Sequence, residues 1–178
     1  MNNIINMIKN IRTCCLALVL ALTGCGLTQS VNQGSKSVAK SIFYKQVKIL
    51  HLDFTARTEL NPDIDGTPLA THIWVYQLKD RQAFDTADYT TLLSNADQLL
   101  KADFLEKKDL WIRPDSEVSL HIPLAENARY VAIMAQFRTP DSALNSWRKV
   151  LDRDDLDPDK TRVIELKGNS LQLVTSKK

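Results

Sequence analysis

Alternating apolar and polar positions over residues 46–57 predict a β-strand with one buried face. Its apolar positions are Leu50, Leu52, Phe54 and Ala56. β-Branched and aromatic residues predict a second strand at 71–79. Similar patterns predict further strands within 104–113, at 118–122, at 130–138 and at 146–151. The run at 130–138 is mostly apolar, which is typical of a central strand with both faces buried.

The dipeptide Gly168-Asn169 predicts a two-residue hairpin turn near the C-terminus. Folding the chain about this turn gives one register in which apolar residues meet apolar ones and polar residues meet polar ones. The opposed pairs are Leu166 with Leu171, Glu165 with Gln172, and Ile164 with Leu173. The two strands of this hairpin bring the predicted strands to eight.

Residues 83–103 follow a different pattern, because their apolar side chains recur every three or four positions. This spacing predicts one or two short helices, at about 86–93 and 95–101. The strand within 104–113 has a helical alternative at 104–109, where polar residues do not alternate with apolar ones. Together these elements predict an all-β domain over residues 46–178, an antiparallel β-sandwich of two sheets with a small helical insertion.

A short apolar run near the N-terminus has the features of a secretory signal peptide. Lys9 and Arg12 precede an unbroken apolar run from Cys14 to Leu22. This run is much shorter than the ~20 residues that a membrane-spanning helix needs. We therefore expect residues 1–24 to be a signal peptide that is removed from the mature protein.

The predicted signal ends in Leu22-Thr23-Gly24-Cys25, which resembles the lipobox of bacterial lipoproteins. The resemblance implies cleavage before Cys25 and covalent attachment of lipid to this residue. Several acyl chains, at about 0.8 kcal/mol per buried methylene, would form a stable anchor. Gly26, where an Asp could stand, implies passage to the outer membrane. The small and polar residues that follow predict a flexible tether, so that residues 25–45 form the lipidated cysteine and its spacer.

Cleavage would also change the charge and the thiol content of the protein. The 178-residue precursor carries a net charge of +2, and Lys9 and Arg12 supply both excess charges. Residues 25–178 would have as many basic side chains as their 21 acidic ones, which gives no support for a nucleic-acid partner. Only the lipidated Cys25 would remain of the three cysteines, which leaves no thiol for a disulfide or a zinc–sulfur site.

Motifs of catalysis and cofactor binding are missing from the sequence, so we expect no enzymatic activity and no cofactor other than the covalent lipid. The chain contains no GxSxG, Walker or dinucleotide-binding motif. The aspartates of residues 152–160 do not follow the EF-hand template, because Asp157 and Val163 stand where Gly and Glu are required. They predict a solvated acidic loop.

Histidines and tryptophans are the remaining candidates for a ligand site. His51, His72 and His121 lack the spacing of metal-binding motifs and would have to converge in the fold, so we predict no metal site. The tryptophans are expected to pack in the core and not to form a ligand-stacking cluster: Trp74, Trp111 and Trp147. A periplasmic lipoprotein that binds a metal or a small ligand nevertheless remains the alternative function.

The segment 58–70 is the best candidate for a binding surface. Its Pro and Gly residues predict a long exposed loop between two well-defined strands. Ile64 and Leu69 are apolar residues in an otherwise polar loop, which favours contact with another molecule. The chain is therefore better suited to binding or scaffolding than to catalysis.

Short motifs in a fixed order carry a resemblance to a known family. After the lipobox come Asn61-Pro62-Asp63, Gly66 and Pro68, Val75-Tyr76-Gln77-Leu78, Phe84 and Asp88, Pro114, Tyr130-Val131-Ala132, Ala135 with Phe137-Arg138, and Trp147-Arg148. Over essentially its whole length the chain resembles the outer-membrane lipoprotein of the type VI secretion system, the TssJ (SciN) family.

This resemblance implies a transthyretin-like sandwich and a role as a structural adaptor at the periplasmic face of the outer membrane. It implies binding to the periplasmic C-terminal region of the inner-membrane protein TssM, which in turn pairs with TssL. The family's main contact with TssM is the loop between the first and second strands. Here the partner-binding residues would be Glu59, Leu60, Asn61, Pro62, Asp63, Ile64, Asp65, Gly66, Thr67, Pro68 and Leu69.

Overall fold

The computed structural model describes residues 47–174, which form two four-stranded sheets and two short α-helices. The first sheet has the strand order β4 (Glu117–Pro123), β1 (Ile49–Ala56), β7 (Arg162–Lys167) and β8 (Ser170–Val174). The second sheet has the order β3 (Phe104–Ile112), β2 (Thr71–Leu78), β5 (Tyr130–Ala135) and β6 (Arg148–Asp152). The helices are α3 (Gln82–Thr86) and α4 (Tyr89–Leu99), and a 3-10 turn, Arg153–Asp155, follows β6.

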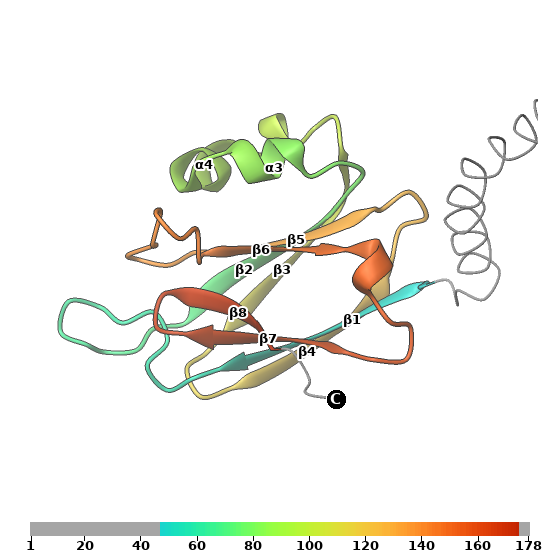
Figure 1. Ribbon diagram of the computed structural model, residues 1–178. Coiled ribbons are helices and arrows are strands. Elements are labelled where there is room, and N and C mark those ends of the chain that lie inside the picture. Colours follow the sequence, from blue (N-terminus) through green and yellow to red (C-terminus); the bar gives the residue numbers. More distant parts are fainter. Residues whose placement is uncertain (1–46, 175–178) are drawn as a thin grey trace, which may run out of the picture. The chain divides into compact units, whose positions relative to one another are not determined.

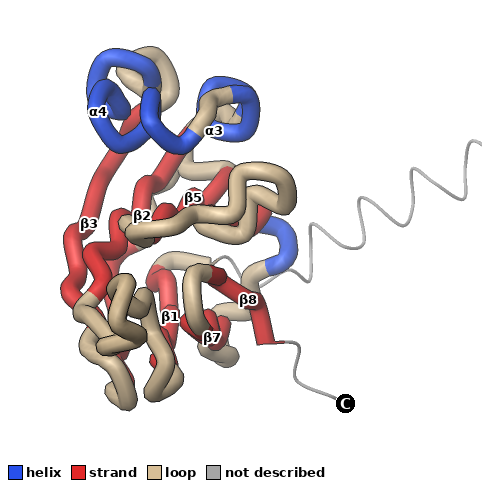
Figure 2. The backbone as a smooth tube through the Cα atoms, turned by 90° about the vertical axis from the view of Figure 1, so that its left-hand side faces the viewer, coloured by secondary structure: helices blue, strands red, loops and turns tan. Residues whose placement is uncertain are grey.

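These elements are arranged in three layers, in the order helices, second sheet, first sheet (Figure 1). Figure 2 shows the same arrangement from the side, with α3 and α4 above the second sheet and the first sheet below it. The outer face of the first sheet has no helical cover in these views. Across the described residues, no helix has the length and apolar character that a membrane crossing requires.

The hydrophobic core lies between the two sheets and continues beneath the helices. Leu50, Leu52 and Phe54 alternate along β1 and are completely buried. On β2, Ile73 and Val75 are likewise completely buried. The predicted alternation of β1 is therefore the pattern of a strand that packs one face against the opposite sheet.

All eight strands predicted from the sequence are present, and so is the two-sheet sandwich. The C-terminal hairpin has the predicted register, including Leu166 opposite Leu171. The segment 104–109 is part of β3 and pairs with β2, so its helical alternative is wrong. The fifth strand ends at Ala135, before the predicted limit of 138, because the Phe137 N–H turns back to donate to the Ala135 carbonyl at 3.1 Å.

One pairing in the first sheet departs from the predicted antiparallel pattern. β1 and β7 run parallel, with Phe54 opposite Ile164, while the other five strand pairings are antiparallel. A parallel pair needs a long connection between its strands, and here most of the domain separates β1 from β7. The register of distant strands cannot be read from local alternation, which explains why the sequence did not predict this pair.

The helical insertion is found as predicted, with different boundaries. α4 begins at Tyr89 because Asp88 caps it: its Oδ1 accepts a hydrogen bond from the Thr91 N–H at 2.8 Å. The break predicted near residue 94 appears within α4 as a kink at Asn95, whose φ and ψ are −141° and 24°. The shorter α3 ends at Thr86, so the predicted start of a helix at 86 is wrong.

Arg148 fastens this insertion to the second sheet. Its guanidinium donates hydrogen bonds to the carbonyl oxygens of Phe84 and Asp85 at 2.7 Å and of Ala87 at 2.8 Å. These carbonyls lie at the end of α3, where backbone acceptors have no partner within the helix. One side chain of β6 therefore satisfies three acceptors and holds the helical layer in place.

Three of the predictions from the sequence lie outside the described residues. They are the signal peptide of residues 1–24, the lipidated Cys25, and the tether of residues 25–45.

Candidate functional site

The loop between β1 and β2, residues 57–70, carries its own hydrogen-bond network at its tip. The Asp63 carboxylate oxygen Oδ1 accepts hydrogen bonds from the backbone N–H of Asp65 at 2.9 Å and of Thr67 at 2.8 Å. The Asp63 N–H donates to the Thr67 carbonyl, and the Gly66 N–H to the Asp63 carbonyl. Gly66 has a φ of +82°, a conformation that favours glycine. The loop tip is thus a defined turn.

The base of this loop is tied to the rest of the domain by Asn61, which is only 4% exposed. Its backbone N–H donates to the Gly168 carbonyl at 2.8 Å, and its side-chain Oδ1 accepts from the Arg138 N–H at 2.8 Å. Its φ of +46° is one that Asn tolerates better than most residues. Leu60 beside it is fully buried in the core.

Of the eleven residues predicted to bind the partner, some are buried and hold the loop in place, and others are exposed. Leu60 and Asn61 are buried, so they position the loop and offer no surface to a partner. Residues 64–68 are exposed, and Ile64 at the tip is 94% exposed. Pro62, Asp63 and Leu69 are half-buried, and Glu59 is exposed. The part of the loop available for contact is therefore centred on Ile64.

Three other connections, residues 113–116, 136–147 and 168–169, lie at the same end of the sandwich as residues 57–70, and we call these four segments the loop end. Figure 1 shows these loops together on the left of the view. The Asn169 side-chain amide links two of them by donating to the Thr139 hydroxyl at 2.7 Å, and the Ala56 N–H at the end of β1 donates to the Ser116 carbonyl of a third at 2.9 Å. Leu144, in residues 136–147, is 79% exposed and was not predicted as a contact residue.

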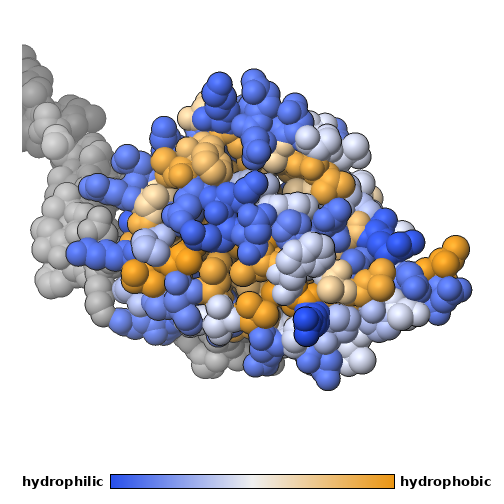
Figure 3. Space-filling view, turned by 180° about the vertical axis from the view of Figure 1, so that it is seen from behind, coloured by the Kyte–Doolittle hydropathy of each residue, from blue (hydrophilic) through white to orange (hydrophobic). Residues whose placement is uncertain are grey.

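Apolar surface at the loop end continues into a hollow of about 400 Å³ beside the loop base. Leu69 and Leu93 contribute to its walls, together with Trp111, which is 64% exposed. The Trp111 ring stacks on the His72 ring with 4.7 Å between the ring centroids, and His72 Nε2 lies 3.3 Å from an oxygen of Asp109. Figure 3, seen from behind, shows hydrophobic atoms at the loop end on its right-hand side, among hydrophilic surface.

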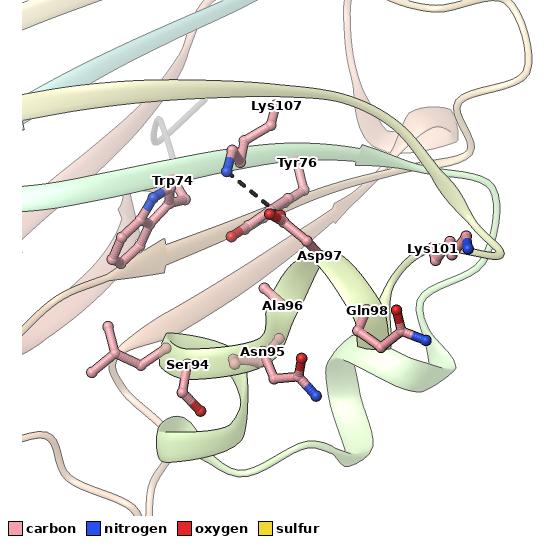
Figure 4. A pocket seen from close by; sticks show the side chains of 11 residues that line it. Trp74, Tyr76, Ser94, Asn95, Ala96, Asp97, Gln98, Lys101 and Lys107 are labelled. Carbon is pink, nitrogen blue, oxygen red and sulfur yellow. Dashed lines mark ion pairs between the residues drawn. The ribbon is translucent and has the colours of Figure 1, made fainter.

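A second hollow, of about 580 Å³, lies between α4 and the outer faces of β2 and β3 (Figure 4). Trp74 and Tyr76 face it from the sheet, and Asp97 of α4 lies 3.6 Å from the Lys107 ammonium of β3. Burial, with further contributions from Asp97 and Asp109, raises the pKa of Tyr76, so this phenol stays neutral. Asp97 and Lys107 thus place an ion pair in the wall of this hollow.

The three tryptophans do not share one environment. Trp147 is completely buried and meets the Tyr89 ring edge-on at 5.1 Å, so the prediction of core packing is confirmed for it. For Trp111 that prediction is wrong, because it lies on the edge strand β3 and is largely exposed. Trp74 is half-buried and contacts the His72 ring. Of the three, Trp111 therefore offers the most surface to a partner.

The three histidines do not converge on one point. His72 lies on β2 in the second sheet, while His51 and His121 lie on β1 and β4 of the first. Within residues 47–174 there is no group of three or more His, Cys, Asp or Glu side chains that could hold a metal ion. His51 and His121, however, are in direct contact, a proximity that their separation in the sequence could not reveal.

The sandwich, its helical cover and the clustered loops define a protein that presents loops from a rigid β-scaffold. Residues 48–169 match the family described as "Type VI secretion lipoprotein, VasD, EvfM, TssJ". The chain therefore belongs to the TssJ family of type VI secretion lipoproteins, as the sequence motifs predicted. Among curated protein sequences, no significant match was found.

Solved structures give the same assignment. A chain in a structure of a type VI membrane complex is 42% identical, with a TM-score of 0.70 over 73% of this chain and 100% of that chain. A chain in a structure of the TssM C-terminal domain from EAEC is 40% identical, with a TM-score of 0.65 over 72% and 99%. The type VI secretion lipoprotein TssJ1 of Pseudomonas aeruginosa is 29% identical, with a TM-score of 0.62 over 71% and 95%.

Proposed function

We propose that this protein is a structural adaptor of the type VI secretion membrane complex, and that its loop end docks onto the periplasmic C-terminal region of TssM. The observation that carries this proposal is Ile64, which is 94% exposed on a loop whose base and tip are fixed by hydrogen bonds. A preordered loop loses little conformational entropy on binding, and exposed apolar groups mark interaction sites.

The similarity to chains from a type VI membrane complex and from a structure of the TssM C-terminal domain supports this choice of partner. Both similar chains are covered almost completely by this one, so the resemblance extends to the whole sandwich with its loops. TssL would then be an indirect partner that is reached through TssM. In this role the chain needs no catalytic residues and acts by binding alone.

The chemistry of the loop tip describes the surface that would receive it. Ile64 is flanked in the sequence by Asp63, whose carboxylate is bonded within the turn, and by the exposed Asp65, so the apolar tip belongs to an acidic loop. A complementary partner would offer an apolar pocket with basic side chains at its rim. Leu144 in residues 136–147 and Trp111 beside Leu69 are further exposed apolar residues that a partner could contact. Binding energy would be concentrated at Ile64, with the carboxylates guiding orientation.

The anchor in this proposal is the lipid on Cys25, which would hold the protein at the periplasmic face of the outer membrane. Replacing this cysteine, as in Cys25→Ser, is expected to move the protein from the outer-membrane fraction to the soluble periplasmic fraction. Sucrose-gradient fractionation followed by immunoblotting measures the distribution. An unchanged outer-membrane fraction would contradict the anchor while leaving the partner proposal intact.

Docking is tested by Ile64→Asp, which places a third carboxylate at the loop tip. Affinity for the purified TssM C-terminal region should fall at least about thirtyfold, the loss that a hot-spot residue of about 2 kcal/mol gives. The matched control is Ile49→Asp, because Ile49 is also an exposed isoleucine, 41% exposed, but lies at the start of β1, away from the loop end. Equal affinities of the two folded variants in a calorimetric titration would refute the loop assignment.

A further inference from the structure

His51 and His121 form a contact pair on the uncovered face of the first sheet. They lie directly opposite each other in the antiparallel pairing of β1 with β4. Their two Nδ1 atoms are 2.7 Å apart, and the ring centroids are separated by 4.8 Å with 58° between the ring planes. The pair is accessible, because His51 is half-buried and His121 is exposed.

This separation is close to the one that a bound metal ion would impose. Two imidazole nitrogens that each lie about 2.0–2.1 Å from one metal ion, in adjacent coordination positions, are about 3 Å apart. The Nδ1 atoms would therefore need to separate by only a few tenths of an ångström to admit the ion. Both backbones are fixed by the strand pairing, so little conformational entropy remains to be lost on binding.

The neighbours of the pair on the same sheet face are already bonded to each other. The next residues on the same face are Asp53 and Ser119, which are also opposed, and the Ser119 hydroxyl donates to an Asp53 carboxylate oxygen at 2.6 Å. Residues 47–174 provide no third His, Cys, Asp or Glu in a metal-binding arrangement. The two histidines would therefore supply two ligands, and water the others.

We propose that His51 and His121 form a two-histidine binding site for a late divalent transition-metal ion, with Cu²⁺ bound most tightly. Imidazole nitrogens suit copper, nickel and zinc, and the order of divalent affinities places Cu²⁺ above Ni²⁺ and Zn²⁺. This site is separate from the loop end, because His51 lies in the first half of β1 and His121 in the second half of β4, away from the strand ends that meet the loops. It is therefore independent of the docking function.

Metal binding at this site leaves the number of protons on the two neutral imidazole rings unchanged. In the free protein one Nδ1–H donates to the lone pair of the other Nδ1. When the metal takes both Nδ1 lone pairs, the shared proton moves through solvent to Nε2 of the ring that donated it. Each ring then carries one proton, on Nε2, and two nitrogen–metal bonds replace one hydrogen bond and two metal–water bonds.

The test uses the full-length lipoprotein in detergent, purified without a histidine tag and titrated with Cu²⁺. We expect His51→Ala and His121→Ala each to weaken Cu²⁺ binding at least tenfold. The double variant should bind Cu²⁺ no more tightly than either single variant. His72→Ala is the matched control, because His72 lies in the other sheet and should leave the affinity unchanged.

Electron paramagnetic resonance of the wild-type Cu²⁺ complex supplies a readout that does not depend on the variants folding. The wild-type protein with one equivalent of Cu²⁺ should show two coupled imidazole nitrogens, and either single variant only one. A wild-type spectrum without two coupled imidazole nitrogens would overturn the proposal. So would Cu²⁺ affinities that are the same for the wild type, His51→Ala and His121→Ala.

Discussion

The two sheets share one core and differ in what covers their other faces. In the first sheet, buried and accessible residues alternate along β1, because one face meets water. In the second sheet, five of the six residues of β5 are buried, because helices cover the face turned away from the core. The same antiparallel architecture thus yields two sequence patterns, and the covered sheet cannot tolerate polar changes that the uncovered sheet can accept.

The largest expected difference between the sheets follows from introducing a charge on each. Ala132, on β5 opposite Tyr76, is completely buried, so Ala132→Lys should lower the free energy of unfolding by about 4–5 kcal/mol, as for an unpaired buried charge. Thr55→Lys, on the uncovered face opposite Glu117 and beside Glu165, should change it by less than about 0.5 kcal/mol. Urea denaturation measures both, and similar losses would contradict the difference between the faces.

Two tryptophans provide the next comparison: Trp147, which comes directly before β6, and Trp111 on β3. Trp147→Ala should cost about 3–5 kcal/mol of unfolding free energy, because the buried indole leaves a large cavity beneath α4. Trp111→Ala should cost less than about 1 kcal/mol, since this side chain is 64% exposed. The two variants should also differ in their affinity for TssM. Trp111→Ala should weaken the complex, while Trp147→Ala should not, at a temperature where this variant is folded.

Removing the Arg148 side chain, which holds the helices on the second sheet, should have an intermediate effect on the free energy of unfolding. Arg148→Ala deletes three hydrogen bonds to helix-end carbonyls and should cost about 2–3 kcal/mol, with burial, which lowers the pKa of Arg148, offsetting part of their value. Amide hydrogen exchange should quicken over 82–99 more than in β1. The control is Arg57→Ala, whose exposed ion pair with Glu165 should contribute less than about 1 kcal/mol.

The smallest expected effect concerns the first turn of α4. Hydrogen bonds from Thr91 hold the pKa of Asp88 below its ordinary value, so the cap stabilises the fold above the ordinary carboxyl pKa. This contribution is lost as the pH falls through the lower folded value. Asp88→Ala should therefore fray α4 at neutral pH and remove this part of the acid dependence, as followed by circular dichroism. An unchanged acid dependence would show that Asp88 does not stabilise the helix.

The sequence predicted features that depend on neighbours along the chain. The hairpin at Gly168-Asn169 has its predicted register because the turn type fixes which residues oppose each other. The parallel pairing of β1 with β7 could not be predicted, because it joins segments that are distant in the sequence. The contact of His51 with His121 was missed for the same reason, since motif spacing detects only ligands that are close along the chain.

The candidate site was predicted in part. The loop between the first two strands was found from its Pro and Gly residues, and its apolar Ile64 is the most exposed large hydrophobic residue described. That Asn61 would be buried could not be foreseen, because its partners, Gly168 and Arg138, come from later parts of the chain. Leu144 and Trp111 join the site only because four connections meet at one end of the sandwich.

The position of Asn61 has a mechanical consequence. Its backbone N–H donates to Gly168 in the turn between β7 and β8, and its side chain accepts from the Arg138 N–H after β5. These two hydrogen bonds reach connections of different sheets. A pull on the loop by a bound partner is therefore shared between both sheets and does not peel one strand from an edge. Force spectroscopy should accordingly find that Asn61→Ala lowers the unfolding force for traction applied at the loop more than for traction applied at the chain ends.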